Sequence, residues 1–387
     1  MNANKLLIAI NYIDDDLLLE AKNFQNKKSK KKNSFMPAIA IVACFAFIAV
    51  LSIIFNILTT NNLPMLDLRI NNNDGMGFEG PFLMNPDDFE SDNPGKYPFL
   101  TSKLPVYENN SHDKKGTPCG LNEKELNETV EKVISALGAK TNNIRKEYAN
   151  ELYGGYEDDF VYSVTAETDI ASITANAAGG LTIFFNTPVT LPFDFNEESI
   201  EDAEKAAEYF CAVYSELISS IIEIKKPKIC ISTEYNVYGD IHRSFRVYDS
   251  SGNKKDDIIN YNLNFAELRI ENNGTLTSIY ISNSSGVVNE IAQYPIITET
   301  KAKEKLISGD YISSVVQYEF PGKEYISNSD LVYKCEKGET IAPYYRFLVE
   351  LPEAPEANGN KSYGIYYVPA IKEEYISEIT LIDGEFQ

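Results

Sequence analysis

The feature that most constrains this chain is an uncharged apolar run at residues 35–58. The run reads FMPAIAIVACFAFIAVLSIIFNIL, and only Ser52 and Asn56 interrupt it with polar side chains. A helix rises 1.5 Å per residue, so a helix of this length spans a hydrocarbon core of roughly 30 Å. The pattern therefore predicts a transmembrane helix from Phe35 to Leu58.

The charges on either side of the run predict its orientation. Five lysines lie within residues 27–32, whereas residues 59–74 are nearly uncharged. The cytoplasmic flank of a membrane span carries the excess of lysine and arginine. We therefore expect a cytoplasmic stub at 1–34 and an extracellular C-terminal region from residue 59. This is the topology of a single-pass cell-membrane protein.

Two alternatives to an anchor are weaker. A cleaved signal peptide has an apolar region of about 7–15 residues and a small-x-small cleavage site, and this run is longer and lacks such a site. Residues 41–44, Ile-Val-Ala-Cys, also match a bacterial lipobox. However, a lipobox cysteine closes the apolar run, whereas Cys44 lies inside it. This position favours the interpretation of Cys44 as a small residue packed in a membrane helix.

The stub itself has helical periodicity over residues 4–24. Its apolar side chains recur on one face, and its acidic side chains occupy the others. A helix this short is marginal alone in water, and its acidic triplet disfavours an anionic membrane surface. We expect the stripe and triplet to contact a protein partner, although a juxtamembrane helix without a partner is an equally open interpretation. The predicted partner-binding residues are Leu6, Ile10, Ile13, Asp14, Asp15, Asp16 and Leu17.

Charge is distributed unevenly along the chain. The whole chain carries −22, but residues 1–34 carry +3, which leaves −25 for residues 59–387. Nucleic-acid binding depends on neutralising phosphates with lysine and arginine. The sequence contains no basic stripe with interleaved aromatic residues, so we expect no nucleic-acid partner.

Beyond the apolar run, residues 59–118 are rich in Asn, Gly, Pro and Asp, which predicts a loop-rich stalk. Helix and strand patterns alternate from residue 119 onwards. The predicted helices lie at 121–138, 197–224 and 298–308. The predicted strands lie at 159–166, 170–176, 181–185, 229–238, 244–249, 261–270, 275–282, 311–320, 330–335, 344–351 and 363–371.

These patterns predict an α+β fold of repeated units, each a helix followed by an antiparallel hairpin. The segments that begin at Ala171 and Ala266 align with each other as strand–turn–strand units. We expect a first extracytoplasmic part at 119–295 and a C-terminal module at 296–387.

No motif for catalysis, metal binding or cofactor binding is present, so we expect no enzyme and no cofactor. A G-x-G-x-x-G at 75–80 follows no predicted strand and opens no helix, so it fails as a dinucleotide fingerprint. Four cysteines follow the apolar run, and their disulfide state is left open. They are Cys119, Cys211, Cys230 and Cys335.

Several segments resemble a largely uncharacterised group of membrane proteins from low-GC Gram-positive bacteria. The stub is similar to the cytoplasmic region of membrane-bound anti-sigma factors, and the C-terminal part is similar to PepSY and YycH-type extracytoplasmic modules. The segments that carry the resemblance are 6–21 (LLIAINYIDDDLLLEA), 104–107 (LPVY), 297–302 (ITETKA), 343–347 (PYYRF) and 366–370 (YYVPA).

The resemblance implies sensing or regulation across the membrane, with an outer ligand or protein and a cytoplasmic partner such as a sigma factor. The sequence leaves two other functions open. One is a non-signalling surface module for binding or envelope assembly, and the other, less favoured, is a hydrolase with two acidic catalytic residues.

Overall fold

The computed structural model describes a largely antiparallel β structure. Of the two units into which the chain divides, Met65–Gln387 contains nearly all the residues described. These are residues 63–71, 81–85, 93–96, 101–113, 116–156, 159–236, 238–315, 317–335, 340–357 and 359–382.

The middle of the chain contains two similar runs of secondary structure. Each run has helical residues followed by four antiparallel strands. The first run comprises α4 (Glu123–Leu137), β4 (Thr141–Tyr148), the short α5 (Ala149–Leu152), β5 (Val161–Thr168), β6 (Ala171–Asn176) and β7 (Gly180–Val189). The second comprises α6 (Ile200–Val213), α7 (Ser215–Ile221), β8 (Pro227–Tyr235), β9 (Ile241–Asp249), α8 (Lys254–Leu263), β10 (Phe265–Ile270) and β11 (Leu276–Ser282).

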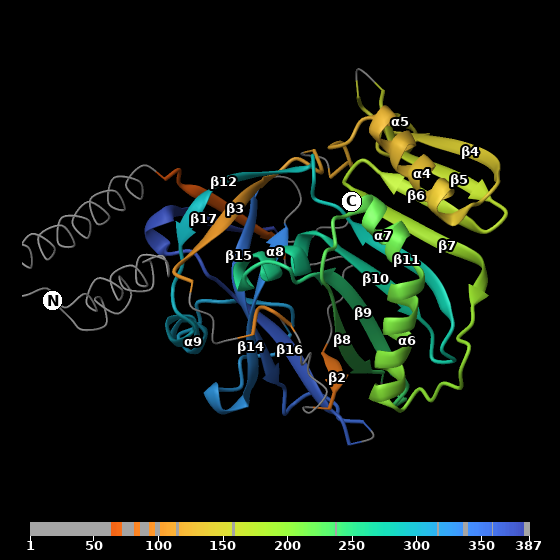
Figure 1. Cartoon of the computed structure of the whole chain (residues 1–387). Helices are drawn as coiled ribbons and strands as arrows, with labels where there is room; N and C mark the ends of the chain where they lie inside the picture. Colours follow the sequence, from red (N-terminus) through yellow and green to blue (C-terminus); the bar gives the residue numbers. More distant parts are fainter. Residues whose placement is uncertain are drawn as a thin grey trace, which may run out of the picture. The chain divides into compact units, whose positions relative to one another are not determined.

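The two runs join in one sheet through the pairing of β7 with β11. The strand order in this part is β8-β9-β10-β11-β7-β6-β5-β4, so the second run mirrors the first across the β7–β11 junction. Figure 1 shows α6 and α7 over the β8–β11 part of the sheet. Buried residues of α4, α6 and α7 form one core with the strands beneath them, as alternation of side chains along each strand requires.

Helix α4 shows how local chemistry sets an element in place. The Asn122 side chain accepts hydrogen bonds from two backbone N–H groups, and the Glu125 carboxylate accepts one from the Asn122 N–H. This capping box satisfies donors that the first turn leaves without partners. At the other end Gly138 adopts φ 62°, which glycine tolerates without steric cost. The predicted helix at 121–138 is confirmed.

The turn between β6 and β7 requires glycine at position 179. Gly179 has φ 87°, and a Cβ atom built there would lie 2.2 Å from the Asn283 carbonyl oxygen. A larger residue would therefore meet both backbone strain and a clash. The Asn176 side chain completes the turn by accepting hydrogen bonds from the backbone N–H groups of Ala178 and Gly180.

A second set of strands continues the same sheet. Its order is β12-β3-β15-β16-β2, and β2 then pairs with β8 of the middle region. The β2–β8 link is a single residue pair, Leu83 with Tyr235. The elements are β2 (Phe82–Met84), β3 (Lys103–Asn109), β12 (Val288–Pro295), α9 (Glu299–Ile307), β13 (Ile312–Ser313), β14 (Ile326–Cys335), β15 (Thr340–Glu350) and β16 (Lys361–Pro369).

The strands near the two ends of this unit pair with each other. β1 (Leu66–Asn71) lies parallel to β17 (Ile376–Ile382) in a separate two-stranded sheet. Two short 3₁₀ helices, Lys323–Tyr325 and Glu373–Tyr375, precede β14 and β17. The region 59–118, expected to be loop-rich, thus contributes β1, β2 and β3 to the sheets.

The predicted PepSY-like fold of repeated helix-plus-hairpin units is wrong. Apart from β1 and β17, the described strands do not form separate hairpin modules under their own helices but join one 15-stranded sheet, in which β14 pairs with β15 and β13 pairs with β16. Local periodicity identifies a strand and its turn, but it carries no information on which distant strand lies alongside. The junctions β7–β11 and β2–β8 are such long-range pairings.

The predicted single-pass membrane topology, with its extracellular C-terminal domain, is also corrected. Across the described ranges, no helix is both long enough and apolar enough to cross a membrane. The segment 35–58, on which that prediction was based, lies outside the described residues. Hydropathy of that segment was the whole basis for the predicted topology.

Three further local predictions are wrong. The predicted strand at 261–270 begins inside helix α8, which ends at Leu263, so strand β10 starts only at Phe265. The predicted strand at 311–320 is reduced to the two residues of β13. The predicted long helix at 197–224 is instead two helices that meet at Tyr214.

Candidate functional site

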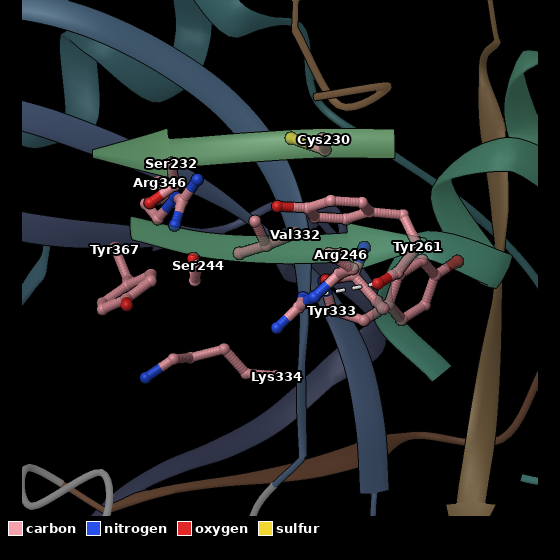
Figure 2. Close-up of a pocket in the computed structure, with 11 residues that line it drawn as sticks. Cys230, Ser232, Ser244, Arg246, Tyr261, Val332, Tyr333, Lys334, Arg346 and Tyr367 are labelled. Carbon is pink, nitrogen blue, oxygen red and sulfur yellow. Dashed lines mark hydrogen bonds between the residues drawn. The ribbon is translucent and has the colours of Figure 1, made fainter. Parts of the chain in front are cut away.

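A cavity of about 330 Å³ lies between the strand pair β8–β9 and the strands β14, β15 and β16 (Figure 2). Side chains alternate along a strand, so the residues of β8 and β9 that line it belong to the face opposite the α6–α7 core. Helix α8 contributes Tyr261 and Asn262 to the lining. The lining residues are Cys230, Ser232, Ser244, Arg246, Tyr261, Asn262, Val332, Tyr333, Lys334, Arg346 and Tyr367.

Three cations from three different strands line this cavity. Arg246 comes from β9, Lys334 from β14 and Arg346 from β15. None of the described residues that line it is acidic. Glu267 and Asp330, the carboxylates paired with Arg246 and Arg346, are not among these lining residues. The charged groups that line the cavity are therefore cationic, as anion binding requires, in a chain with a formal charge of −22.

Arg246 is held against aromatic rings. Its guanidinium carbon lies 4.0 Å from the ring centroid of Phe265 and 4.9 Å from that of Tyr261. One terminal nitrogen donates to the Tyr261 carbonyl at 3.3 Å, and the other reaches Glu267 at 3.4 Å. Cation–π contact and the weak ion pair together fix the direction of this side chain.

Arg346 is held by a buried carboxylate. Its Nε donates to Oδ1 of Asp330 at 2.9 Å, and a terminal nitrogen donates to Oδ2 at 2.5 Å. The Asp330 side chain is fully buried, whereas that of Arg346 is 21% exposed. Asn93 also donates to Asp330 Oδ2, at 2.7 Å. This bidentate pair places the guanidinium at the cavity wall with a fixed orientation.

Lys334, the third cation of the cavity, lies against the ring of Tyr367. The Lys334 Nζ lies 3.9 Å from the centroid of the Tyr367 ring. Tyr367 pairs with Arg346 in the register of β15 and β16. The aromatic ring therefore lies next to one cation and in contact with another.

Uncharged polar groups complete the lining. Ser232 and Ser244 face each other across β8 and β9. The Tyr333 hydroxyl donates to the Pro105 carbonyl at 2.9 Å, and its backbone N–H donates to Asn262 at 3.2 Å. Burial raises the pKa of Tyr333 well above its usual value, and Tyr107 and Glu290 raise it further. Tyr333 is therefore a neutral phenol at pH 7.

A smaller cavity of about 40 Å³ adjoins the first and shares Ser232 and Arg346 with it. Its other lining residues are mostly apolar and come from β2, β8, β15 and β16. They are Phe82, Met84, Glu234, Leu348 and Ile365. Arg346 consequently lies between a polar cavity and a mainly apolar one.

None of the described residues that line the cavity was predicted as a partner-binding residue. The predicted partner-binding residues Leu6, Ile10, Ile13, Asp14, Asp15, Asp16 and Leu17 lie outside the described residues, so their role stays a prediction. Of the cysteines, Cys119, Cys211 and Cys230 are reduced thiols, and Cys230 lines the cavity at 2% exposed. The side chain of Cys335 lies outside the described set.

The sequence did contain one signal for the cavity. Arg346 lies in the run PYYRF, where a cation interrupts apolar and aromatic residues of a strand. Charged residues are rarely buried without a partner, so a cation in such a strand indicates an internal ion pair or a ligand site. Arg246 in SFRVY and Lys334 in LVYKC show the same pattern, but the sequence does not show that the three strands line one cavity.

The comparisons with known proteins leave the function open. No family model matches the chain, and no curated protein matches it. Among solved structures, an uncharacterized protein from Eubacterium rectale is similar over 70% of this chain and 84% of that one, with 10% sequence identity and a TM-score of 0.34.

Proposed function

We propose that this chain is a regulatory binding protein that takes a small anionic molecule into the cavity between β8–β9 and β14–β16. The observation that carries the proposal is the convergence of Arg246, Lys334 and Arg346 on one cavity with no acidic residue among its described lining. Guanidinium groups match carboxylates and phosphates in both charge and geometry.

Preorganisation of the cations supports binding. Arg246 and Lys334 are stacked on aromatic rings, and Arg346 is paired with Asp330. Ordering a long side chain on binding costs about 0.5–1.5 kcal/mol. Here most of that ordering is already present before a ligand arrives, so more of the interaction energy remains as affinity.

The placement of the cavity supports a regulatory role. Its walls come from two parts of the sheet, which β2 joins through the single pair Leu83–Tyr235. A ligand that contacts β9 and β15 together stabilises the arrangement in which both walls are in place. Ligand binding then favours one conformation over others.

The predicted stripe at Leu6, Ile10, Ile13 and Leu17 supplies the second half of this proposal, which is contact with a protein partner. Crosslinking and pull-down would compare the intact chain with one that lacks residues 2–24. A protein recovered with the intact chain alone would support regulation through a partner. Equal recovery from both would favour a binding module that acts without this segment.

Anion binding is tested by unfolding the full chain in urea with and without a small anion. We would use phosphate, citrate and a neutral sugar at equal ionic strength. An anion at 100 times its Kd should add about 2.7 kcal/mol to the free energy of unfolding, and the sugar should add nothing. Lys334→Gln should reduce the gain.

The matched control for that variant is Lys124→Gln, because Lys124 is 84% exposed on α4 and pairs with the exposed Glu128 at 3.6 Å. It removes the same charge away from the cavity, so it should leave the gain unchanged. If both variants lose the gain equally, or if no anion stabilises the chain, the proposed function is wrong.

A further inference from the structure

The two arginines of the cavity lie at different places along β8 and β9. Arg246 pairs with Cys230 in the register, and the next pair on the same face is Ser244 with Ser232. Arg346 borders the smaller cavity together with Ser232. Two residues along a strand correspond to roughly 6.6–6.8 Å, so the arginines mark two separate positions.

Figure 2 shows the same separation. Arg346 lies beside Ser232, Arg246 lies beside Tyr261 and Tyr333, and Ser244 and Val332 occupy the space between them. Lys334 lies on a different side of the cavity from the two arginines. The three positive charges therefore surround the cavity instead of meeting at one point.

Each arginine is held where it is by its own partners. Arg346 is bound through two nitrogens to the buried Asp330, and Arg246 is stacked on Phe265 at 4.0 Å. Moving either guanidinium toward the other would break these contacts. A single compact anion such as phosphate therefore cannot be bound bidentately by both arginines at once.

Given the proposed function, on which this inference rests, we infer that the ligand carries two acidic groups separated by a short uncharged linker. One group binds at Arg346 and Ser232, and the other binds at Arg246. The linker passes Val332 and Ser244, a small apolar side chain and a small neutral one. A short aliphatic dicarboxylate is the chemical class that fits.

The test is calorimetric titration of the full chain with dicarboxylates from succinate to pimelate. Each is compared with the monocarboxylate of the same chain length and with inorganic phosphate. We expect at least one dicarboxylate to bind ten-fold or more tightly than its monocarboxylate counterpart and than phosphate. An optimum at one chain length should reflect the fixed spacing of the arginines.

Variants identify the two positions. Arg246→Gln should bring the affinity of the best dicarboxylate down to that of its monocarboxylate, and Ser232→Ala should weaken both ligands. Arg269→Gln is the matched control, because Arg269 is a 65% exposed arginine of β10 paired with Glu271. It should leave all affinities unchanged.

The outcomes separate this inference from the proposed function. If phosphate binds as tightly as every dicarboxylate, or if dicarboxylates and monocarboxylates bind equally, the two-group ligand is wrong but an anion site remains. If no anion binds at all, both are wrong. If Arg246→Gln weakens dicarboxylates and monocarboxylates by the same factor, the assignment of a separate second group to Arg246 is overturned.

Discussion

Removing Arg346 should destabilise the fold more than neutralising its partner Asp330. The carboxylate is fully buried, and the guanidinium is 21% exposed. In Arg346→Met a buried charge loses its cation, although the hydrogen bond from Asn93 remains. In Asp330→Asn the side-chain shape is kept, and the arginine that loses its counterion can turn its exposed part to water.

The magnitudes follow from this difference in burial. Removing one partner of a buried pair costs about 3–5 kcal/mol, and we expect Arg346→Met to fall in that range. Losing charged hydrogen bonds without leaving a buried charge costs about 1.5–3 kcal/mol, which is the range we expect for Asp330→Asn. The double variant should cost less than the sum, with a coupling energy of about 1–3 kcal/mol.

Urea unfolding of the four proteins, followed by circular dichroism, measures these free energies. A parallel cycle on Arg269 and Glu271, an exposed pair at 3.1 Å, should give a coupling energy below about 1 kcal/mol. The reasoning is refuted if Asp330→Asn costs as much as Arg346→Met. Additive costs in the buried pair would refute it equally.

Three more predictions concern other parts of the fold. Asn122→Ala removes the N-cap of α4 and should cost about 1 kcal/mol in urea unfolding, whereas no loss would show that the cap contributes nothing. Burial acts to raise the pKa of Asp249, but hydrogen bonds from the Ser251 hydroxyl and nearby backbone N–H groups outweigh it and hold that pKa below its usual value. Asp249→Asn should therefore cost about 1–3 kcal/mol at pH 7. This difference should narrow as the pH falls below about 3.9, the ordinary aspartate pKa, because Asp249 of the unfolded chain then becomes protonated while that of the folded chain stays ionised until a lower pH; a difference that is constant with pH would contradict this. Alkylation of the native chain, followed by mass spectrometry, should modify the exposed Cys119 well before Cys230, which is 2% exposed, and equal rates would mean that the cavity opens readily.

The elements predicted correctly from the sequence depend on contacts between neighbours in the chain. The helix at α4 is marked at both ends, by Asn122 with Glu125 and by Gly138. The β6–β7 hairpin is marked by its glycine pair at 179–180. In each case the residues that decide the conformation lie within a few positions of one another, so a linear pattern contains the necessary information.

Helix α8 shows where such patterns are ambiguous. Its buried residues Ile258, Tyr261 and Leu263 are spaced by three and then by two. A spacing of three is typical of a helix and a spacing of two of a strand. The N-cap Asn253, whose side chain accepts from two backbone N–H groups, resolves the ambiguity in favour of a helix, but an asparagine before a polar run is also common in loops.

The strongly acidic charge, the alternation of helix and strand patterns in the middle of the chain, and the caps and turns can all be predicted from local sequence. The order of strands in the 15-stranded sheet and the cavity depend on the tertiary structure. Arg246 and Arg346 are a hundred positions apart in the chain, and they line one cavity because β2 pairs with both β8 and β16. Such pairing depends on the packing of whole strands over long loops, and that energy is not present in any short stretch of sequence.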